Sequence, residues 1–228
     1  PEGFKEGPFV FERNGIYYYT FPWVRNNTET LAYAIGDNPL GPFEFKGIIM
    51  EESPTDCWTN HHSIVEYKDQ WYLFYHHNDY SPDFDKNRAA RIDSLFFNSD
   101  GTIQEVIPTL RGVGVTASSS KIHLDRYSDI SKKGATIEFV DDQNPFEGWK
   151  IVFDETNAWV RYNSVDFGDT AQQKVKARIS SSSGCKVLLQ QNHLGKKNIA
   201  EIEVPAGGNW QEITVPVKNI PNGIYDIE

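Results

Sequence analysis

The chain has 228 residues, a formal charge of −10 at pH 7 and 14% aromatic residues. Because the balance is acidic and no dense run of Lys and Arg occurs, the chain as a whole would repel a nucleic-acid backbone or an anionic membrane surface. Neutral ligands such as glycans are compatible with this charge. The abundant Trp and Tyr residues suit either the stacking of sugar rings or an ordinary aromatic-rich β core, and composition does not separate the two.

Cysteine and methionine usage adds two expectations. Cys57 and Cys185 fall in different halves of the chain, so the sequence predicts free thiols and no disulfide framework. The only methionine is Met50, so the chain does not begin at a translation start. We therefore expect a piece of a longer protein.

The N-terminal stretch predicts a β-hairpin. Asn14-Gly15 supplies the positive φ angles that a two-residue turn requires, and the flanking segments 9–11 and 16–21 are apolar and aromatic. Glu6 lies just before the first strand, beside a glycine and a proline that restrict the backbone. A carboxyl group held there among aromatics is a candidate general acid, whereas a glutamate in such a turn is more often a solvated surface residue.

The rest of the first half, to about residue 107, shows no sustained helical periodicity. Short apolar or aromatic segments alternate with turn-rich stretches, which predicts an antiparallel meander. Asp100-Gly101 marks a later hairpin turn. The expected strands after the first hairpin are 30–35, 43–49, 60–67, 71–77 and 88–93.

These motifs, in this order, resemble glycoside hydrolase family 43, which contains β-xylosidases, α-L-arabinofuranosidases and arabinanases on a five-bladed β-propeller. The resemblance implies that Glu6 is the catalytic acid and that His61, His76 and Arg88 line the substrate pocket. It also implies that His61 contacts a central calcium or its waters, although calcium prefers oxygen ligands and a strand-end histidine is often only structural. Arg91 departs from the family, which has a small or apolar residue there.

A domain boundary is predicted at residues 108–120, where Gly, Ser and Thr replace the aromatic pattern. We expect one domain over residues 1–112 and a second over 121–228. The segments of the second half are shorter and less aromatic, and their spacing predicts a β-sandwich. The expected strands are 136–140, 158–165, 172–180, 185–191, 198–204 and 210–217.

The second half resembles the family 6 carbohydrate-binding modules, jelly-roll sandwiches often fused behind family 43 domains. The resemblance rests on the strings 158–162, 165–168 and 207–212. It implies that Trp210 stacks on a sugar ring, with Phe153 as the first candidate partner and Trp149 as the next. A buried Trp in the sandwich core is the alternative.

The same resemblance implies a structural calcium held partly by Asp125 and Glu138. Carboxylate oxygens suit calcium, while isolated acids at strand edges are usually only solvated. The family would continue past the last residue of this chain with a further strand and an Asn that contacts the sugar.

Together these patterns predict an all-β chain: the last blades of an incomplete five-bladed propeller followed by a jelly-roll β-sandwich. The resemblance implies a fragment of an inverting glycoside hydrolase that acts on xylan, arabinoxylan, arabinan or derived oligosaccharides, located in the extracellular or periplasmic space. The family's catalytic base lies in blades that this chain lacks, so we expect the chain alone to be inactive. The alternatives are a non-catalytic glycan-binding β-protein and a structural β-protein with no sugar site.

Overall fold

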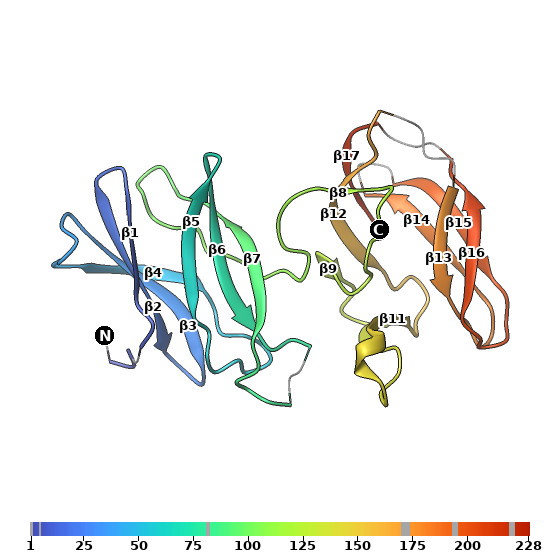
Figure 1. Cartoon of the computed structure of the whole chain (residues 1–228), viewed down its shortest axis with the longest axis horizontal. Coiled ribbons are helices and arrows are strands. Elements are labelled where there is room, and N and C mark those ends of the chain that lie inside the picture. The colour runs from blue at the N-terminus through green and yellow to red at the C-terminus, as the bar shows by residue number, and fades with distance from the viewer. Residues whose placement is uncertain (1, 5, 81–82, 170–173, 193–195, 219–221) are drawn as a thin grey trace. The chain divides into compact units, whose positions relative to one another are not determined.

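The computed structural model describes residues 2–4, 6–80, 83–169, 174–192, 196–218 and 222–228. The regular structure of these residues is β-strand apart from one short 3₁₀ helix, η1 (Pro145–Glu147), so the all-β prediction is confirmed. The chain divides into two compact units, Pro1–Val113 and Gly114–Glu228 (Figure 1). Within the described residues, no helix is long and apolar enough to cross a membrane.

The first sheet of the N-terminal unit is an antiparallel meander of four strands in the order β1-β2-β3-β4. Asn14 and Gly15 join the first two strands with φ angles of 54° and 78°, as predicted from the dipeptide. The strands are β1 (Phe9–Arg13), β2 (Ile16–Val24), β3 (Glu29–Gly36) and β4 (Glu44–Met50).

The second sheet of this unit has three antiparallel strands, β5 (His62–Tyr67), β6 (Gln70–His77) and β7 (Ala89–Leu95). After β7, the predicted turn at Asp100-Gly101 is closed by a single bridge between Phe97 and Ile103. The expected strands of the first half are therefore confirmed.

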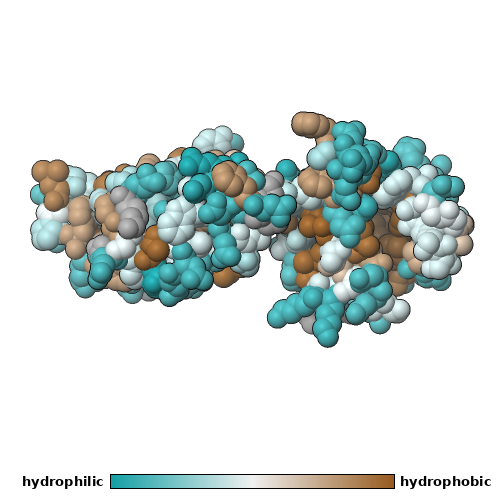
Figure 2. Space-filling model, turned by 90° about the horizontal axis from the view of Figure 1, so that it is seen from below, coloured by the Kyte–Doolittle hydropathy of each residue, from teal (hydrophilic) through white to brown (hydrophobic). Residues whose placement is uncertain are grey.

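The core of the N-terminal unit lies between its two sheets. Alternate residues of each strand point to the same face, and one face of each sheet meets the other in a buried cluster. Phe21, Ala32 and Ala34 form a second, smaller buried cluster on the opposite face of the first sheet. The opposite faces stay partly open to solvent: Val10 and Phe45 are 43% and 47% exposed on the first sheet, and Val65 and Phe74 are 44% and 42% exposed on the second. Hydrophobic side chains accordingly reach the surface seen in Figure 2.

The described residues of the C-terminal unit form ten strands. A larger sheet has the order β15-β14-β17-β12-β8, with β9 paired to β12, and two-stranded sheets are formed by β13-β16 and β10-β11. The strands are β8 (Thr116–Ala117), β9 (Asp129–Ile130), β10 (Ala135–Phe139), β11 (Trp149–Phe153), β12 (Val160–Asp166), β13 (Lys174–Ile179), β14 (Cys185–Gln191), β15 (Lys197–Val204), β16 (Gln211–Pro216) and β17 (Ile224–Ile227).

The six strands predicted for this half are all present, with ends shifted by up to two residues. Residues 172 and 173 of the expected third strand lie outside the described residues. Two longer strands, β11 and β17, are not predicted by the sequence pattern. The last one lies inside the larger sheet, between β14 and β12, and its Ile227 belongs to the core together with Tyr162 and Val165.

Candidate functional site

The four pocket residues predicted for the first half lie in one cluster. The carboxylate Oε1 of Glu6 is 3.5 Å from Nε2 of His61, and the ring centroids of His61 and His76 are 6.3 Å apart. Nε2 of His76 and Nε of Arg88 are each 3.3 Å from the hydroxyl of Thr59. The sequence did not single out Thr59, which joins two members of the cluster.

The second sheet brings His61, His76 and Arg88 together because all three lie at the same end of its strands. His61 immediately precedes β5, His76 is near the end of β6, and Arg88 immediately precedes β7. Since neighbouring strands are antiparallel, the start of β5, the end of β6 and the start of β7 meet at the same edge. Glu6 approaches from the loop before β1, where a Cβ on Gly7 would lie 3.2 Å from Nε2 of His61. The glycine permits this close approach.

A buried glutamate completes the cluster. Glu29, the first residue of β3, is 3% exposed, and its Oε2 accepts the backbone N–H of Asn60 at 2.7 Å. Burial raises the pKa of Glu29 above its ordinary value, and the negative charge of Glu6 acts in the same direction, while the Asn60 N–H, His61 and Arg88 oppose it. The only sequence signal was a charged residue directly before the predicted strand 30–35.

Unpaired polar atoms mark the same place. Asn60 is fully buried, yet both polar atoms of its side-chain amide lack a hydrogen-bond partner among the described residues, as does Nδ1 of His62. Buried polar groups without partners are rare in folded proteins. Their concentration beside Glu6 and Glu29 is typical of a functional site.

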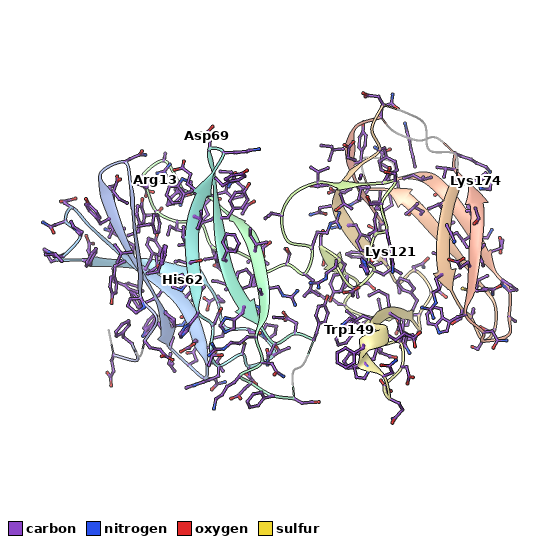
Figure 3. All side chains as sticks on the ribbon, viewed as in Figure 1. Arg13, His62, Asp69, Lys121, Trp149 and Lys174 are labelled. Carbon is purple, nitrogen blue, oxygen red and sulfur yellow. The ribbon has the colours of Figure 1, made fainter. Side chains whose placement is uncertain are left out.

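Two histidines near Glu6 are held neutral. Burial lowers the pKa of His62 to about 4, helped by the nearby His61, and burial together with Arg88 lowers the pKa of His76 to about 4. At neutral pH these rings therefore act as hydrogen-bonding groups and not as cations. His62 (Figure 3) uses Nε2 to bond the hydroxyl of Thr20 at 2.7 Å.

The cluster is suited to proton donation by one carboxyl group. The Glu6 side chain is 62% exposed and so accessible to a ligand, whereas Glu29 is buried and engaged by a backbone N–H. Arg88 contributes the permanent positive charge. Glycoside hydrolysis with inversion needs a second carboxylate on the opposite face of the sugar, and Glu29 is too enclosed for that role.

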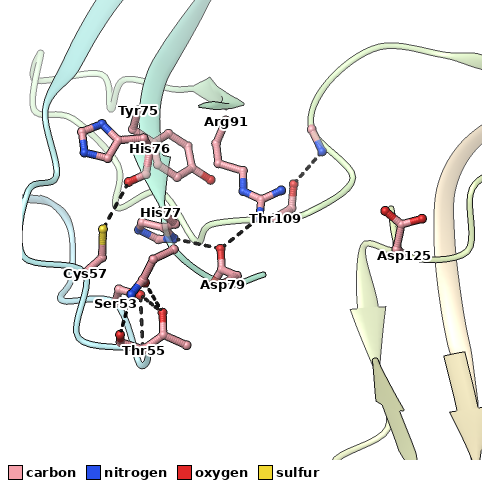
Figure 4. A network of polar contacts seen from close by, with 12 residues as sticks. Ser53, Thr55, Cys57, Tyr75, His76, His77, Asp79, Arg91, Thr109 and Asp125 are labelled. Atoms are coloured by element: carbon pink, nitrogen blue, oxygen red, sulfur yellow. Dashed lines mark hydrogen bonds and ion pairs between the residues drawn. The ribbon is translucent and has the colours of Figure 1, made fainter. Parts of the chain in front are cut away.

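A second polar network lies beside the cluster (Figure 4). Asp79 Oδ2 is 3.1 Å from Nη2 of Arg91 and 3.5 Å from Nδ1 of His77. Burial raises the pKa of Asp79, but its contacts with His77 and Arg91 outweigh burial and lower that pKa. Arg91, the departure from the family pattern, is therefore a buried, paired arginine. The Tyr75 hydroxyl donates to Asp93 at 2.5 Å. We infer that this network holds the segment after His76 in place.

In the C-terminal unit, Trp210 is 42% exposed and is not a core residue. The guanidinium of Arg178 lies over its ring at 5.0 Å from the centroid. Trp149 (Figure 3) stacks on Phe139 at 4.0 Å, so one of its faces is occupied. Phe153 is 41% exposed and lies at the other end of β11.

The two acids expected to hold calcium each lie close to a basic side chain. Asp125 lies 3.4 Å from Nε of Arg126, and Glu138 lies 3.5 Å from Nζ of Lys150. Throughout the described part of the chain, no three His, Cys, Asp or Glu side chains gather where they could hold a metal ion. Calcium is also bound by backbone carbonyl oxygens, so a calcium ion at Asp125 and Glu138, or near His61, stays a prediction from the resemblance.

Two family models match the chain. Residues 2–103 match the model of glycosyl hydrolases family 43, and residues 128–228 match that of carbohydrate binding module family 6. A β-xylosidase of Xylanibacter ruminicola is 42% identical over 106 residues, which are 46% of this chain and 32% of that protein. An arabinoxylan arabinofuranohydrolase of Paenibacillus polymyxa is 24% identical over 247 residues, covering 97% of this chain and 39% of that protein.

The chain thus spans less than half of the length of these curated relatives. A solved structure with a similar fold is the family 43 arabinoxylan arabinofuranohydrolase from Bacillus subtilis in complex with cellotetraose. It is 22% identical with a TM-score of 0.55, over 99% of this chain and 50% of that one. This likeness supports the fold.

Proposed function

Residues 2–103 belong to family 43 of the glycosyl hydrolases and residues 128–228 to family 6 of the carbohydrate-binding modules, and from this we propose that the chain is part of an inverting glycosidase. Its substrates are xylose- or arabinose-containing plant polysaccharides, namely xylan, arabinoxylan or arabinan, and their oligosaccharides. The observation that carries the proposal is the cluster in which the exposed Glu6 faces His61 beside Arg88 and His76.

In this mechanism Glu6 protonates the glycosidic oxygen as the bond to the leaving group breaks. His61, 3.5 Å from the carboxylate, orients it toward the bound sugar. Arg88 and the neutral His76 bind sugar hydroxyl groups from the edge of the second sheet. A carboxylate from elsewhere in the enzyme deprotonates water on the opposite face, at the roughly 6.5–9.5 Å separation that inversion requires.

The relatives support the substrate class. A β-xylosidase and two xylosidase/arabinosidases match 44–46% of the chain, and a protein that matches 97% of it is described as an arabinoxylan arabinofuranohydrolase. Because the proposed substrate is a plant polymer, we propose that the enzyme acts outside the cytoplasm, in the extracellular or periplasmic space. No step of the mechanism uses calcium.

The test is Glu6→Gln in the full-length enzyme. General acid catalysis contributes about 10²–10⁴-fold, so we expect a loss of that order with xylo-oligosaccharides, whose leaving groups need protonation. Aryl glycosides with acidic leaving groups should lose far less. Glu66→Gln, which changes an exposed carboxylate on β5, is the matched control. Equal losses for both substrate types would exclude Glu6 as the acid.

For the chain alone we propose glycan binding without hydrolysis. The observation that favours this second function is the single accessible carboxylate in the cluster, since Glu29 is enclosed. Incubation of the 228-residue chain with xylohexaose should release no shorter products. Product release that is abolished by Glu6→Gln would show that a second catalytic carboxylate is present.

A further inference from the structure

The hydroxyl of Thr59 contacts two of the groups that the cluster offers to a sugar. Oγ1 of this half-buried threonine is 3.3 Å from Nε of Arg88 and 3.3 Å from Nε2 of His76. A hydroxyl has one proton and two lone pairs, so it can form hydrogen bonds with both groups at once. Since arginine only donates, the Nε–H of Arg88 donates to Thr59. The threonine thereby links the end of β6 to the residue just before β7.

The backbone on both sides of Thr59 is held by other parts of the unit. The N–H of Trp58 donates to the carbonyl oxygen of Asp85 at 2.8 Å. The N–H of Asn60 donates to the buried carboxylate of Glu29 at 2.7 Å. Because both neighbours are anchored, the Thr59 hydroxyl has a fixed position and can in turn fix the groups that it binds.

The Arg88 side chain has few other contacts to hold it. It is exposed, and within the described residues its guanidinium forms a single hydrogen bond, the one to Thr59. A long exposed side chain loses conformational freedom when it is held in one arrangement, so a bond formed before the ligand arrives lowers the cost of binding. Because Thr59 engages Nε, both Nη groups remain available as a pair of adjacent donors.

On the basis of the proposed hydrolase function, we propose that Thr59 is a positioning residue for sugar recognition. Its hydroxyl holds Arg88 through Nε and His76 through Nε2, so that the Nη groups of Arg88 and the remaining edge of the His76 ring face the same sugar. Thr59 touches neither the sugar nor the glycosidic oxygen. Its effect on turnover passes through Arg88 and His76, and not through proton donation by Glu6.

This role differs from that of Glu6 in a way that kinetics can measure. The hydroxyl groups of the bound sugar are the same in every xyloside, whereas the need for protonation depends on the leaving group. Loss of the Thr59 hydroxyl should therefore slow xylo-oligosaccharides and aryl xylosides by equal factors. A threonine that only stabilised the fold would leave the turnover of the folded enzyme unchanged.

The first experiment measures kcat/KM of the full-length enzyme with xylohexaose and with an aryl xyloside that has an acidic leaving group. Thr59→Val replaces the hydroxyl by a methyl group of similar size. It should lower kcat/KM about tenfold or more on both substrates, because a hydrogen bond to a charged group is lost. Thr59→Ser keeps the hydroxyl and should restore most of the rate.

Thr102→Val is the matched control. The Thr102 hydroxyl also joins two partners, since it accepts from Asn98 at 2.8 Å and donates to Asp100 at 2.7 Å. This turn follows β7 and so lies at the opposite end of that strand from Arg88. The substitution should leave kcat/KM unchanged on both substrates.

The second experiment measures the contact itself, in the 228-residue chain. NMR gives the rate at which the Nε–H of Arg88 exchanges with water, and a hydrogen-bonded N–H exchanges more slowly than one open to water. Exchange should be severalfold slower in the wild type and in Thr59→Ser than in Thr59→Val. In the wild type it should also be slower than exchange at Nε of Arg25, whose contact with Glu51 uses Nη2.

The outcomes separate the inference from the proposed function. If Thr59→Val keeps the wild-type kcat/KM, or if the Nε–H of Arg88 exchanges as fast as that of Arg25, the inference fails and the hydrolase function stands. Unequal losses on the two substrates would link Thr59 to proton donation and overturn the inference as well. If the full-length wild type cleaves neither substrate, the proposed function fails, and the positioning role fails with it even where slow exchange shows the contact to be present.

Circular dichroism melting of each variant confirms that it is folded. Should Thr59→Val not fold, Thr59→Ala removes the same hydroxyl with a smaller side chain, and the same losses are expected. The comparison of Arg88 with Arg25 needs no variant.

Discussion

At the scale of single residues, Glu29 is a buried carboxyl group whose pKa is raised by its burial. Removing a carboxylate from water is unfavourable unless partners compensate for the lost hydration, and the one hydrogen bond from Asn60 does so only in part, because the pKa of Glu29 stays raised. Residues whose pKa is shifted by burial and by nearby charges concentrate at functional sites. Glu29 therefore anchors the segment that carries His61 at some expense in stability.

We predict that Glu29→Gln stabilises the chain at neutral pH. An acid whose folded pKa is raised contributes stability below its unfolded pKa and loses it as the pH rises through the folded pKa. Gln keeps the acceptor for Asn60 and removes the charge. In urea denaturation the variant should be more stable than the wild type at pH 7, and the gain should vanish below the ordinary value of 4.5.

Glu51→Gln, which alters an exposed ion pair with Arg25, is the control and should show no such gain. A Glu29→Gln variant that is less stable than the wild type at pH 7 would contradict this account of Glu29. In the full-length enzyme the same substitution should lower turnover, since the anchored segment positions His61.

His62 predicts a loss of stability in acid. Its pKa falls from 6.5 to about 4 on folding, so the unfolded chain binds more protons between these values and stability decreases as the pH falls through this window. The loss should be on the order of 2–3 kcal/mol. His62→Gln should flatten the pH dependence of the unfolding free energy between pH 7 and 4, whereas substitution of the exposed His123 by Gln should not. Equal slopes for the wild type and both variants would contradict the assignment of this pH dependence to His62.

At the scale of elements, the β1-β2 hairpin shows how directly local sequence determines structure. Gly15 has a φ of 78°, and a Cβ at this position would contact nothing within 4 Å. The whole effect of adding a side chain there is thus the cost of a left-handed backbone for a residue with Cβ.

Gly15→Ala should accordingly reduce the free energy of unfolding by about 1–2 kcal/mol. Asn14→Gly, at the preceding residue with a φ of 54°, should change it by less than this because glycine also accepts that conformation. Chemical denaturation of both variants measures the difference. A neutral Gly15→Ala substitution would mean that the turn differs from the one described.

At the scale of the whole molecule, the N-terminal unit exposes large apolar side chains on the outer faces of both of its sheets. Phe74 lies on the outer face of the central strand β6, and Phe45 on that of the first sheet. Exposed apolar sheet surface promotes association. In the proposed full-length enzyme, further blades would cover these faces.

We therefore predict that the 228-residue chain self-associates and that Phe74→Glu reduces this association. Leu40→Glu is the matched control, because Leu40 is 94% exposed in a loop and belongs to neither face. Sedimentation velocity at several concentrations provides the measurement. A wild-type chain that remains monomeric at all concentrations would argue that these faces need no partner.

The sequence by itself determined most of the strands, the hairpin turns and the order of the motifs. Asn14-Gly15 and the alternating segments encode their structure through backbone preferences and side-chain periodicity, which act over a few residues. Glu6, His61, His76 and Arg88 were selected because the ordered motifs around them resemble family 43. The locality of the backbone and side-chain preferences also explains why β17 was missed, since its four residues become a strand only between β14 and β12.

Only the tertiary structure decided which side chains meet. Glu29 contacts Asn60, Thr59 joins His76 to Arg88, and Glu147 reaches Arg178 across 31 positions of the chain. No local pattern encodes these contacts, because burial and distance depend on how whole sheets pack. The calcium ligands and the sugar-stacking partners come from the family resemblance, and they stay predictions because no contact among the described residues tests them.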